Sequence, residues 1–210
     1  MKQMSKKYAI AVDARKCIDC KACMIACKVE NGLPQGFWRN WIKDNDPNGG
    51  MHTQFQPGQC MQCDSPSCVS ACPVGATFKG ADGLVVIDPK KCIGCGNCVT
   101  ACPYDARFRN PETAIADKCD FCHHRIKVGE EPACVETCPT RTRVFGDLND
   151  PESEISKLLK STKHIQIINP LINTRPNIYY TEQTALLNWP KEPTLPGNIH
   201  MSSQFWKGSS

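Results

Sequence analysis

The chain has 210 residues, which is enough for one domain or two small ones. Its apolar fraction is an ordinary 40%, but 14 glycines and 16 prolines exclude a large continuous core, so the sixteen cysteines must supply the cross-links that a thin core lacks. The formal charge is +4, but many of the basic residues lie beside cysteines, so a nucleic-acid-binding surface is only the alternative interpretation of this charge. No apolar run approaches the length of a membrane span.

The first expected element is a strand over residues 8–12, a short apolar run that ends at Asp13. This run is too short for the apolar part of a secretory signal. We therefore expect a soluble chain without an export signal of its own. Disulfide bonds usually require such a signal and an oxidising compartment, so we favour metal binding and keep a disulfide scaffold as an alternative.

Four cysteine runs follow, with four cysteines in each. Run I is Cys17, Cys20, Cys23 and Cys27; run II is Cys60, Cys63, Cys68 and Cys72; run III is Cys92, Cys95, Cys98 and Cys102; run IV is Cys119, Cys122, Cys134 and Cys138. Run III reads C-x2-C-x2-C-x3-C-P, the pattern that holds iron–sulfur clusters in bacterial ferredoxins. The first three thiolates bind one cubane, and a short helix carries the fourth to a neighbouring cubane.

The runs resemble one another in two pairs. Residues 84–88 and run III repeat residues 9–13 and run I at a constant offset of 75 residues. Runs II and IV both continue Cys-Val-x-x-Cys-Pro, and run IV has seven extra residues between its second and third cysteines. We therefore infer a tandem duplication of a two-cluster unit. Run I has Lys28 where the other runs have proline, so its turn should differ.

Two segments separate cysteines without belonging to the runs. Residues 28–59 are expected to be an inserted loop, whose Trp38 and Trp41 pack over the core or against a partner, with packing favoured. Residues 123–131 are expected to be a solvated excursion. Its two histidines, His123 and His124, follow a cysteine, and we assign them structural roles because cysteines fill every cluster position.

The segment after run IV contains a different kind of sequence. A helix should begin with Asp150 as its N-cap and run to about Lys160. Short strands are expected at residues 165–168 and 177–180. The proline-rich tail from Asn188 onward should be disordered or lie extended on another subunit.

Sixteen cysteines in four sets of four fit four [4Fe–4S] clusters with none left over. Structural zinc, which prefers paired C-x2-C halves, is the alternative. Each oxidised cluster with its thiolates carries about −2, so four of them would turn the formal +4 into about −4. Basic residues near the runs are therefore expected to compensate cluster charge; these are Lys16, Lys21, Lys28, Lys90, Lys91, Lys118, Arg125 and Lys127.

The rule that a fourth cysteine crosses over assigns the iron ligands. Adjacent runs II and III should pair like one ferredoxin, and runs I and IV should pair around them. The expected sets are Cys17, Cys20, Cys23 and Cys138 for cluster a; Cys27, Cys119, Cys122 and Cys134 for cluster b; Cys60, Cys63, Cys68 and Cys102 for cluster c; and Cys72, Cys92, Cys95 and Cys98 for cluster d. No catalytic residues are expected, because the sequence contains no nucleophile–base pair, phosphate-binding loop or dinucleotide fingerprint.

Two motifs suggest a family. The segments Cys-Pro-Tyr-Asp-Ala-Arg at 102–107 and Cys-Val-Glu-Thr-Cys-Pro-Thr at 134–140, with the order of the runs, resemble the four-cluster electron-transfer subunit of respiratory molybdopterin oxidoreductases, the dimethyl sulfoxide reductase family. The segments at 145–148 and 174–176 look most like the polysulfide and thiosulfate reductase branch. The resemblance covers about residues 7–180 and gives no role to the rest of the tail.

The resemblance implies partners and a location. The partners would be a molybdopterin-containing catalytic subunit, acting on a sulfur, arsenic or similar oxyanion or S-oxide substrate, and an integral membrane subunit that handles quinones. The subunit would lie at the periplasmic face of the cytoplasmic membrane, exported with its catalytic partner, with the cytoplasmic face as the alternative. The chain would transfer electrons and would not be an enzyme by itself. A free soluble polyferredoxin is the alternative function.

We expect an α+β fold built from two ferredoxin-like units and an extended C-terminal tail. Residues 1–53 and 114–148 should form an outer unit with runs I and IV. Residues 54–113 should form an inner unit with runs II and III, and residues 149–210 a helix, short strands and a partner-binding tail.

Overall fold

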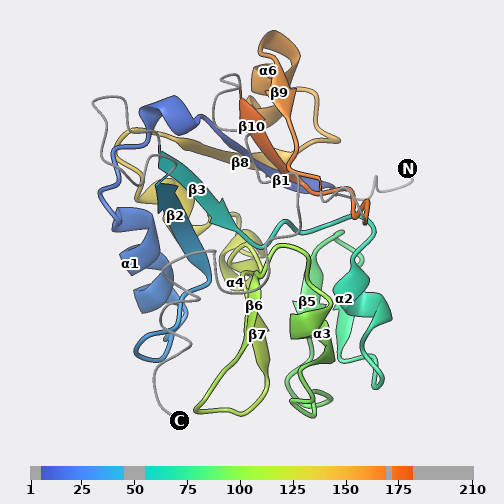
Figure 1. The fold of residues 1–210 in the computed structure, drawn as a ribbon. Helices are drawn as coiled ribbons and strands as arrows, with labels where there is room; N and C mark the ends of the chain where they lie inside the picture. Colours follow the sequence, from blue (N-terminus) through green and yellow to red (C-terminus); the bar gives the residue numbers. More distant parts are fainter. Residues whose placement is uncertain (1–5, 45–54, 169–171, 182–210) are drawn as a thin grey trace.

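The computed structural model describes residues 6–44, 55–168 and 172–181 (Figure 1). Its largest sheet has four strands in the order β8-β1-β10-β9. These strands are β1 Tyr8–Val12, β8 Arg143–Asp147, β9 His164–Ile165 and β10 Ile178–Thr181. Strand β1 runs antiparallel to β8 and parallel to β10, so the first and last described strands lie side by side.

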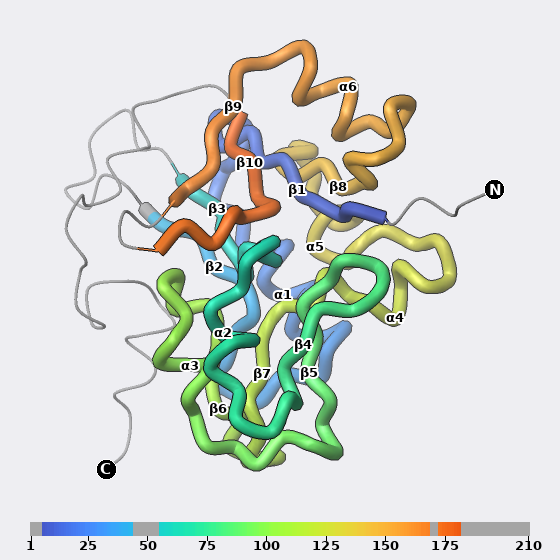
Figure 2. Tube along the Cα trace, turned by 90° about the vertical axis from the view of Figure 1, so that its right-hand side faces the viewer, coloured from blue at the N-terminus to red at the C-terminus, as the bar shows by residue number. Residues whose placement is uncertain are grey.

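Both faces of β1 are covered, which explains why its sequence is apolar throughout rather than alternating. Ala9 and Ala11 pack against Ile155 of helix α6, Glu154–Ser161. Ile10 and Val12 belong to the main core on the other face. Figures 1 and 2 both show α6 at the same end of the molecule as this sheet.

Three antiparallel hairpins in the described residues support the cysteine runs. They pair β2 Asn40–Asp44 with β3 Phe55–Gln59, β4 Thr77–Lys79 with β5 Val85–Ile87, and β6 Arg107–Arg109 with β7 Ala116–Lys118. Strand β3 ends directly before Cys60, and β7 ends directly before Cys119. A paired strand therefore fixes the point at which runs II and IV begin.

Each run places its third cysteine on a helix. These helices are α1 Ala22–Glu30 with Cys23, α2 Ser67–Ser70 with Cys68, α3 Asn97–Thr100 with Cys98 and α5 Ala133–Glu136 with Cys134. Helix α1 has nine residues, whereas the other three have four each. The expected difference in run I is confirmed, because proline after the fourth cysteine of the other runs cannot continue a helix and Lys28 can. In Figure 1, α1 lies on one side of the β6–β7 hairpin, and α2 and α3 lie on the other.

Several expected elements are confirmed, and some differ in extent. The strands expected at residues 8–12, 84–88 and 177–180 correspond to β1, β5 and β10. The strand expected at residues 165–168 is wrong in extent, because β9 covers only His164–Ile165.

The predicted start of the C-terminal helix is wrong. Helix α6 begins at Glu154, and its N-cap is Ser153, whose Oγ accepts the Ser156 N–H at 3.2 Å. Asp150 instead accepts the Glu152 N–H at 2.9 Å. An Asp side chain that bonds the backbone two residues on closes a turn, so Asp150 forms the turn before the helix rather than its cap.

The two segments between cysteines are more ordered than the sequence suggests. Trp41 lies in β2, is 6% exposed and belongs to the main core, against which Trp38 packs. Packing is therefore confirmed for this pair, and a partner-facing Trp41 is wrong. The prediction that residues 123–131 are a solvated excursion agrees with their exposure, because none of them is buried, although the segment begins with a short helix, α4 His123–Ile126. The tail from Asn188 lies outside the described residues.

Short helices and small sheets agree with the expected α+β class. The β2–β3 hairpin spans the predicted boundary at residues 53 and 54, and the β6–β7 hairpin spans the boundary at residues 113 and 114. The division into an outer and an inner unit stays a prediction. Among the described residues, we find no helix with the length and apolar character needed to cross a membrane.

Candidate metal centres

All sixteen cysteines lie in the described part of the molecule, and none of them forms a disulfide bond there. We refer to the four sets that the sequence predicts as centres a, b, c and d. Centre a is Cys17, Cys20, Cys23 and Cys138; centre b is Cys27, Cys119, Cys122 and Cys134; centre c is Cys60, Cys63, Cys68 and Cys102; centre d is Cys72, Cys92, Cys95 and Cys98.

The structure brings the four cysteines of centre a and the four of centre c to the walls of two separate cavities. The first cavity is lined by Cys17, Cys20, Cys23 and Cys138, together with Ile18, Pro139 and Arg143. The second is lined by Cys60, Cys63, Cys68 and Cys102, together with Val85, Tyr104 and Arg107. In each cavity, three cysteines come from one run and the last cysteine comes from another, as the crossover rule requires.

The four cysteines of centre b are buried side by side. Burial and the neighbouring thiols Cys134 and Cys122 all raise the pKa of Cys27. Burial likewise raises the pKa of Cys119, with further contributions from Cys27 and Cys134. Thiols that suppress one another's ionisation in this way need a cation or a metal before they can all be thiolates.

Centre d is more open. Cys98 is buried, Cys72 and Cys92 are half-buried, and Cys95 is exposed. Helix α2, which ends shortly before Cys72, packs against α3, which carries Cys98, so runs II and III meet at this pair of helices.

Backbone N–H groups point at the sulfur of the crossing cysteines. Ala106 donates to Cys102 Sγ at 3.5 Å, and Thr142 donates to Cys138 Sγ at 3.3 Å. Thr77 donates to Cys72 Sγ at 3.5 Å. Burial would raise the pKa of Cys72, but the N–H groups of the turn that follows outweigh it and lower the pKa. N–H groups aimed at sulfur stabilise thiolates, so these residues fit the cysteine-bound iron–sulfur clusters that the run spacing predicts.

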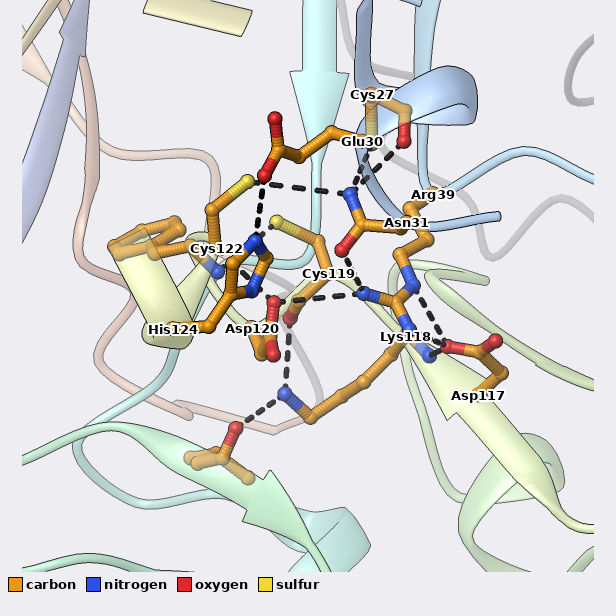
Figure 3. A network of polar contacts seen from close by, with 12 residues as sticks. Cys27, Glu30, Asn31, Arg39, Asp117, Lys118, Cys119, Asp120, Cys122 and His124 are labelled. Carbon is orange, nitrogen blue, oxygen red and sulfur yellow. Dashed lines mark hydrogen bonds and ion pairs between the residues drawn. The ribbon is translucent and has the colours of Figure 1, made fainter. Parts of the chain in front are cut away.

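A polar network lies beside centre b (Figure 3). Asn31 Nδ2 lies 3.6 Å from Cys27 Sγ and 3.9 Å from Cys122 Sγ. Arg39 Nη1 donates to Asn31 Oδ1 at 2.7 Å, and Arg39 Nε donates to Asp117 Oδ1 at 2.7 Å. Because a guanidinium can only donate, Arg39 fixes the amide so that its NH2 group faces the two sulfurs. The two histidines of α4 contact carboxylates instead: His123 lies 2.6 Å from Asp82, and His124 lies 2.6 Å from Glu30.

The sequence interpretation included Lys118 among the basic residues near the runs but missed Arg107 and Arg143. All three side chains are buried. A sequence signal for the two arginines exists: each stands five residues after the crossing cysteine of its run, in Cys-Pro-x3-Arg at 102–107 and at 138–143. Asn31 has no comparable signal, because it lies four residues after Cys27 on a helix end that only run I possesses.

Comparison with known proteins defines the class first. Residues 51–148 match a protein family described as a 4Fe-4S dicluster domain, and residues 16–76 match a second family with the same description. The chain therefore contains tandem iron–sulfur domains that bind 4Fe–4S clusters.

Relatives that align over most of the sequence define the family. The chain is 44% identical over 179 residues to the B subunit of tetrathionate reductase from Salmonella typhimurium, covering 83% of this chain and 72% of the relative. It is 43% identical over 162 residues to the thiosulfate reductase electron transfer subunit of Salmonella typhi, covering 75% of this chain and 83% of the relative. It is 40% identical over 181 residues to the B component of polysulfide reductase from Wolinella succinogenes, covering 84% and 94%. This chain therefore belongs to the family of iron–sulfur electron-transfer subunits of reductases, and the resemblance predicted from its motifs is confirmed.

Proposed function

We propose that this chain holds four [4Fe–4S] clusters, one in each of centres a to d, and relays electrons within a reductase complex. The observation that carries this proposal is the pair of cavities, each lined by three cysteines of one run and the crossing cysteine of another. When bound, such clusters take up and release single electrons. Two dicluster domains in tandem are consistent with a total of four.

The chain's residues divide this task. Sixteen thiolates hold the iron, the backbone N–H groups of the turns at 77, 106 and 142 donate to thiolate sulfur, and the apolar side chains around centres b and c exclude water. We further propose the two ferredoxin-like units predicted from the run pairing, with centres c and d in the inner unit and centres a and b in the outer unit.

Exposure supports a path that runs from centre d to centre a. Cys20 and Cys95 are the exposed cysteines of the described residues, and they belong to centres a and d. The isoleucines that precede them in their loops, Ile18 and Ile93, are 61% and 64% exposed. Centres b and c are deeper, so electrons enter and leave through the loops of runs I and III.

The relatives are named as parts of reductases, which supports a complex with further subunits for this chain. We propose that the outer unit faces a molybdopterin-containing catalytic subunit, which reduces a sulfur oxyanion, S-oxide or similar substrate. The inner unit faces an integral membrane subunit that exchanges electrons with quinones. The complex lies at the periplasmic face of the cytoplasmic membrane.

Metal analysis of anaerobically purified protein tests the cofactor. Iron and acid-labile sulfide should each reach about sixteen per chain, four for each cubane. Cys138→Ala should remove the electron paramagnetic resonance (EPR) signal of the centre formed by the rest of run I's ligands, whereas Cys27→Ala should remove a different one, although Cys27 lies in run I. A colourless protein that contains zinc contradicts the proposal. Purification of a tagged chain from its native host should recover a large molybdopterin subunit, and recovery of the chain alone would favour a free polyferredoxin.

A further inference from the structure

Three cations are buried without a carboxylate partner among the described residues. Arg107, Lys118 and Arg143 are 1%, 2% and 3% exposed. None of the ion pairs formed by the described residues includes any of them. An isolated buried charge is strongly unfavourable unless an opposite charge compensates it, so each of these three needs an anion nearby.

Arg143 lies between centres a and b. It starts strand β8, lines the cavity of centre a and pairs with the uncharged side chain of Gln59. Its Nη2 atom has no hydrogen-bond partner in the described part of the molecule. Strand β8 packs against helix α5, which carries Cys134 of centre b.

Lys118 lies between centres b and c. It ends strand β7, and its Nζ donates to the backbone oxygen of Cys119, a member of centre b, at 2.9 Å. Its second acceptor is the backbone oxygen of Val85, which lines the cavity of centre c. Figure 3 shows this side chain reaching from β7 away from the Arg39 network.

Arg107 lies between centres c and d. It starts strand β6 and lines the cavity of centre c, where its Nη2 donates to Cys68 Sγ at 3.0 Å. Its Nη1 donates to Thr77 Oγ1 at 3.3 Å. Cys68 packs in the same apolar cluster as Cys98 and Cys92 of centre d. Thr77, whose hydroxyl accepts the bond from Arg107, donates its backbone N–H to Cys72 Sγ of centre d at 3.5 Å, so the arginine connects residues of both centres.

We propose that Arg143, Lys118 and Arg107 form an alternating row with the four centres, one cation between each consecutive pair, and that each cation raises the reduction potential of the two centres beside it. The inference rests on the proposed function, because cluster and thiolate charge is the missing anion. Reduction adds negative charge, which a cation at short range in a poorly hydrated site stabilises. Arg39 provides the contrast: it is partly buried near centre b but pairs with Asp117 at 2.7 Å, so an adjacent carboxylate largely cancels its field.

The row predicts which potentials move when one cation is removed. In the full chain with its clusters assembled, Arg107→Gln should lower the potentials of centres c and d and leave those of centres a and b unchanged. Arg143→Gln should lower the potentials of centres a and b only, and Lys118→Gln those of centres b and c. EPR-monitored potentiometric titration measures all four. Lys157→Gln is the control, because it removes the same charge from an exposed helix position.

One further variant, Arg107→Lys, separates charge from shape. Arg107→Lys keeps the charge and should retain potentials near those of the wild type. Arg107→Gln could fail to assemble one cluster. In that case an Arg107→Lys protein with all four clusters supports the row, and an Arg107→Lys protein that lacks the same cluster overturns it. Four assembled clusters with wild-type potentials in Arg107→Gln also overturn the row but leave the proposed function intact. A wild-type chain without clusters overturns both.

Discussion

The amide of Asn31 offers a direct test of how the protein tunes one centre. Asn31 Nδ2 faces the sulfurs of Cys27 and Cys122 at 3.6 and 3.9 Å, and Arg39 holds the amide in that orientation. We predict that Asn31→Leu lowers the reduction potential of centre b. The sign follows because an N–H donor stabilises the more negative, reduced state more than the oxidised state.

The magnitude follows from the geometry. Both contacts are long, so together they resemble one ordinary hydrogen bond with a net value of about 0.5–1.5 kcal/mol. The potential changes only by the difference in this free energy between the two redox states, so the whole value is an upper bound. Since about 1.4 kcal/mol corresponds to about 59 mV for a one-electron couple, the potential should fall by up to about 60 mV. Asn31→Asp should lower it further, because a carboxylate replaces the donor.

Redox titration of the purified complex, followed by EPR, measures the shift. Asn31 Nδ2 also donates to the backbone oxygen of Cys27 at 2.9 Å, so thermal unfolding should be measured in parallel to detect a fraying helix α1. Arg39→Lys is the companion variant: it keeps the charge but loses the planar fork, and it should shift centre b in the same direction by less. An unchanged or higher potential in Asn31→Leu, with four clusters assembled, would refute this reasoning.

Three other predictions concern the loop of run III, pH and the clusters themselves. Gly94 has φ +67°, and a Cβ there would lie 2.1 Å from the Ala114 carbonyl oxygen. Gly94→Ala should therefore abolish centre d and lower the iron content by about a quarter. Gly96→Ala is the control and should retain centre d, because Gly96 has φ +82° but open space around its Cβ position. The Arg15 side chain lowers the pKa of Asp13 despite burial. The stability lost in Asp13→Asn should therefore be constant above about pH 5 and should shrink as pH falls below about 4, where the carboxyl of the unfolded chain binds a proton. Thermal unfolding measured against pH checks this, with Asp88→Asn as the control at the repeated position. Removing iron with a chelator should abolish fixed tertiary structure, measured by near-ultraviolet circular dichroism, and an apoprotein that unfolds as cooperatively as the holoprotein would contradict this.

The local fold near the cysteines could be predicted because spacing and proline act over a few residues. The short helices after the second cysteine, the longer α1 where Lys28 replaces proline, and the strands β1 and β5 all follow from such rules. The pairing of β1 with β8 and β10 could not be predicted. Those partners lie more than a hundred residues away, and only tertiary packing selects their register.

The candidate site divides in the same way. The crossover rule assigns Cys138 to a centre with run I and Cys102 to a centre with run II, and these cysteines line cavities with the first three cysteines of those runs; iron ligation by them stays a prediction. Composition suggested that basic residues compensate cluster charge, but it could not tell buried cations from exposed ones. Lys16 and Lys91 pair with the Asp three residues earlier, whereas Lys118 turns inward. Burial, which depends on the whole fold, decides the difference.

Buried amides explain how a thin core can hold the centres in fixed positions. Gln62 Nε2 donates to the Cys119 backbone oxygen at 2.9 Å, and Gln62 Oε1 accepts the Val85 N–H at 2.7 Å, so one side chain joins run II to run IV and to β5. Asn177, next to β10, donates to the Gln62 backbone oxygen at 2.7 Å. Directional bonds of this kind specify separation and orientation more closely than apolar contact does. Because electron transfer between neighbouring centres requires a constant separation, the polar links between the runs serve function as well as folding.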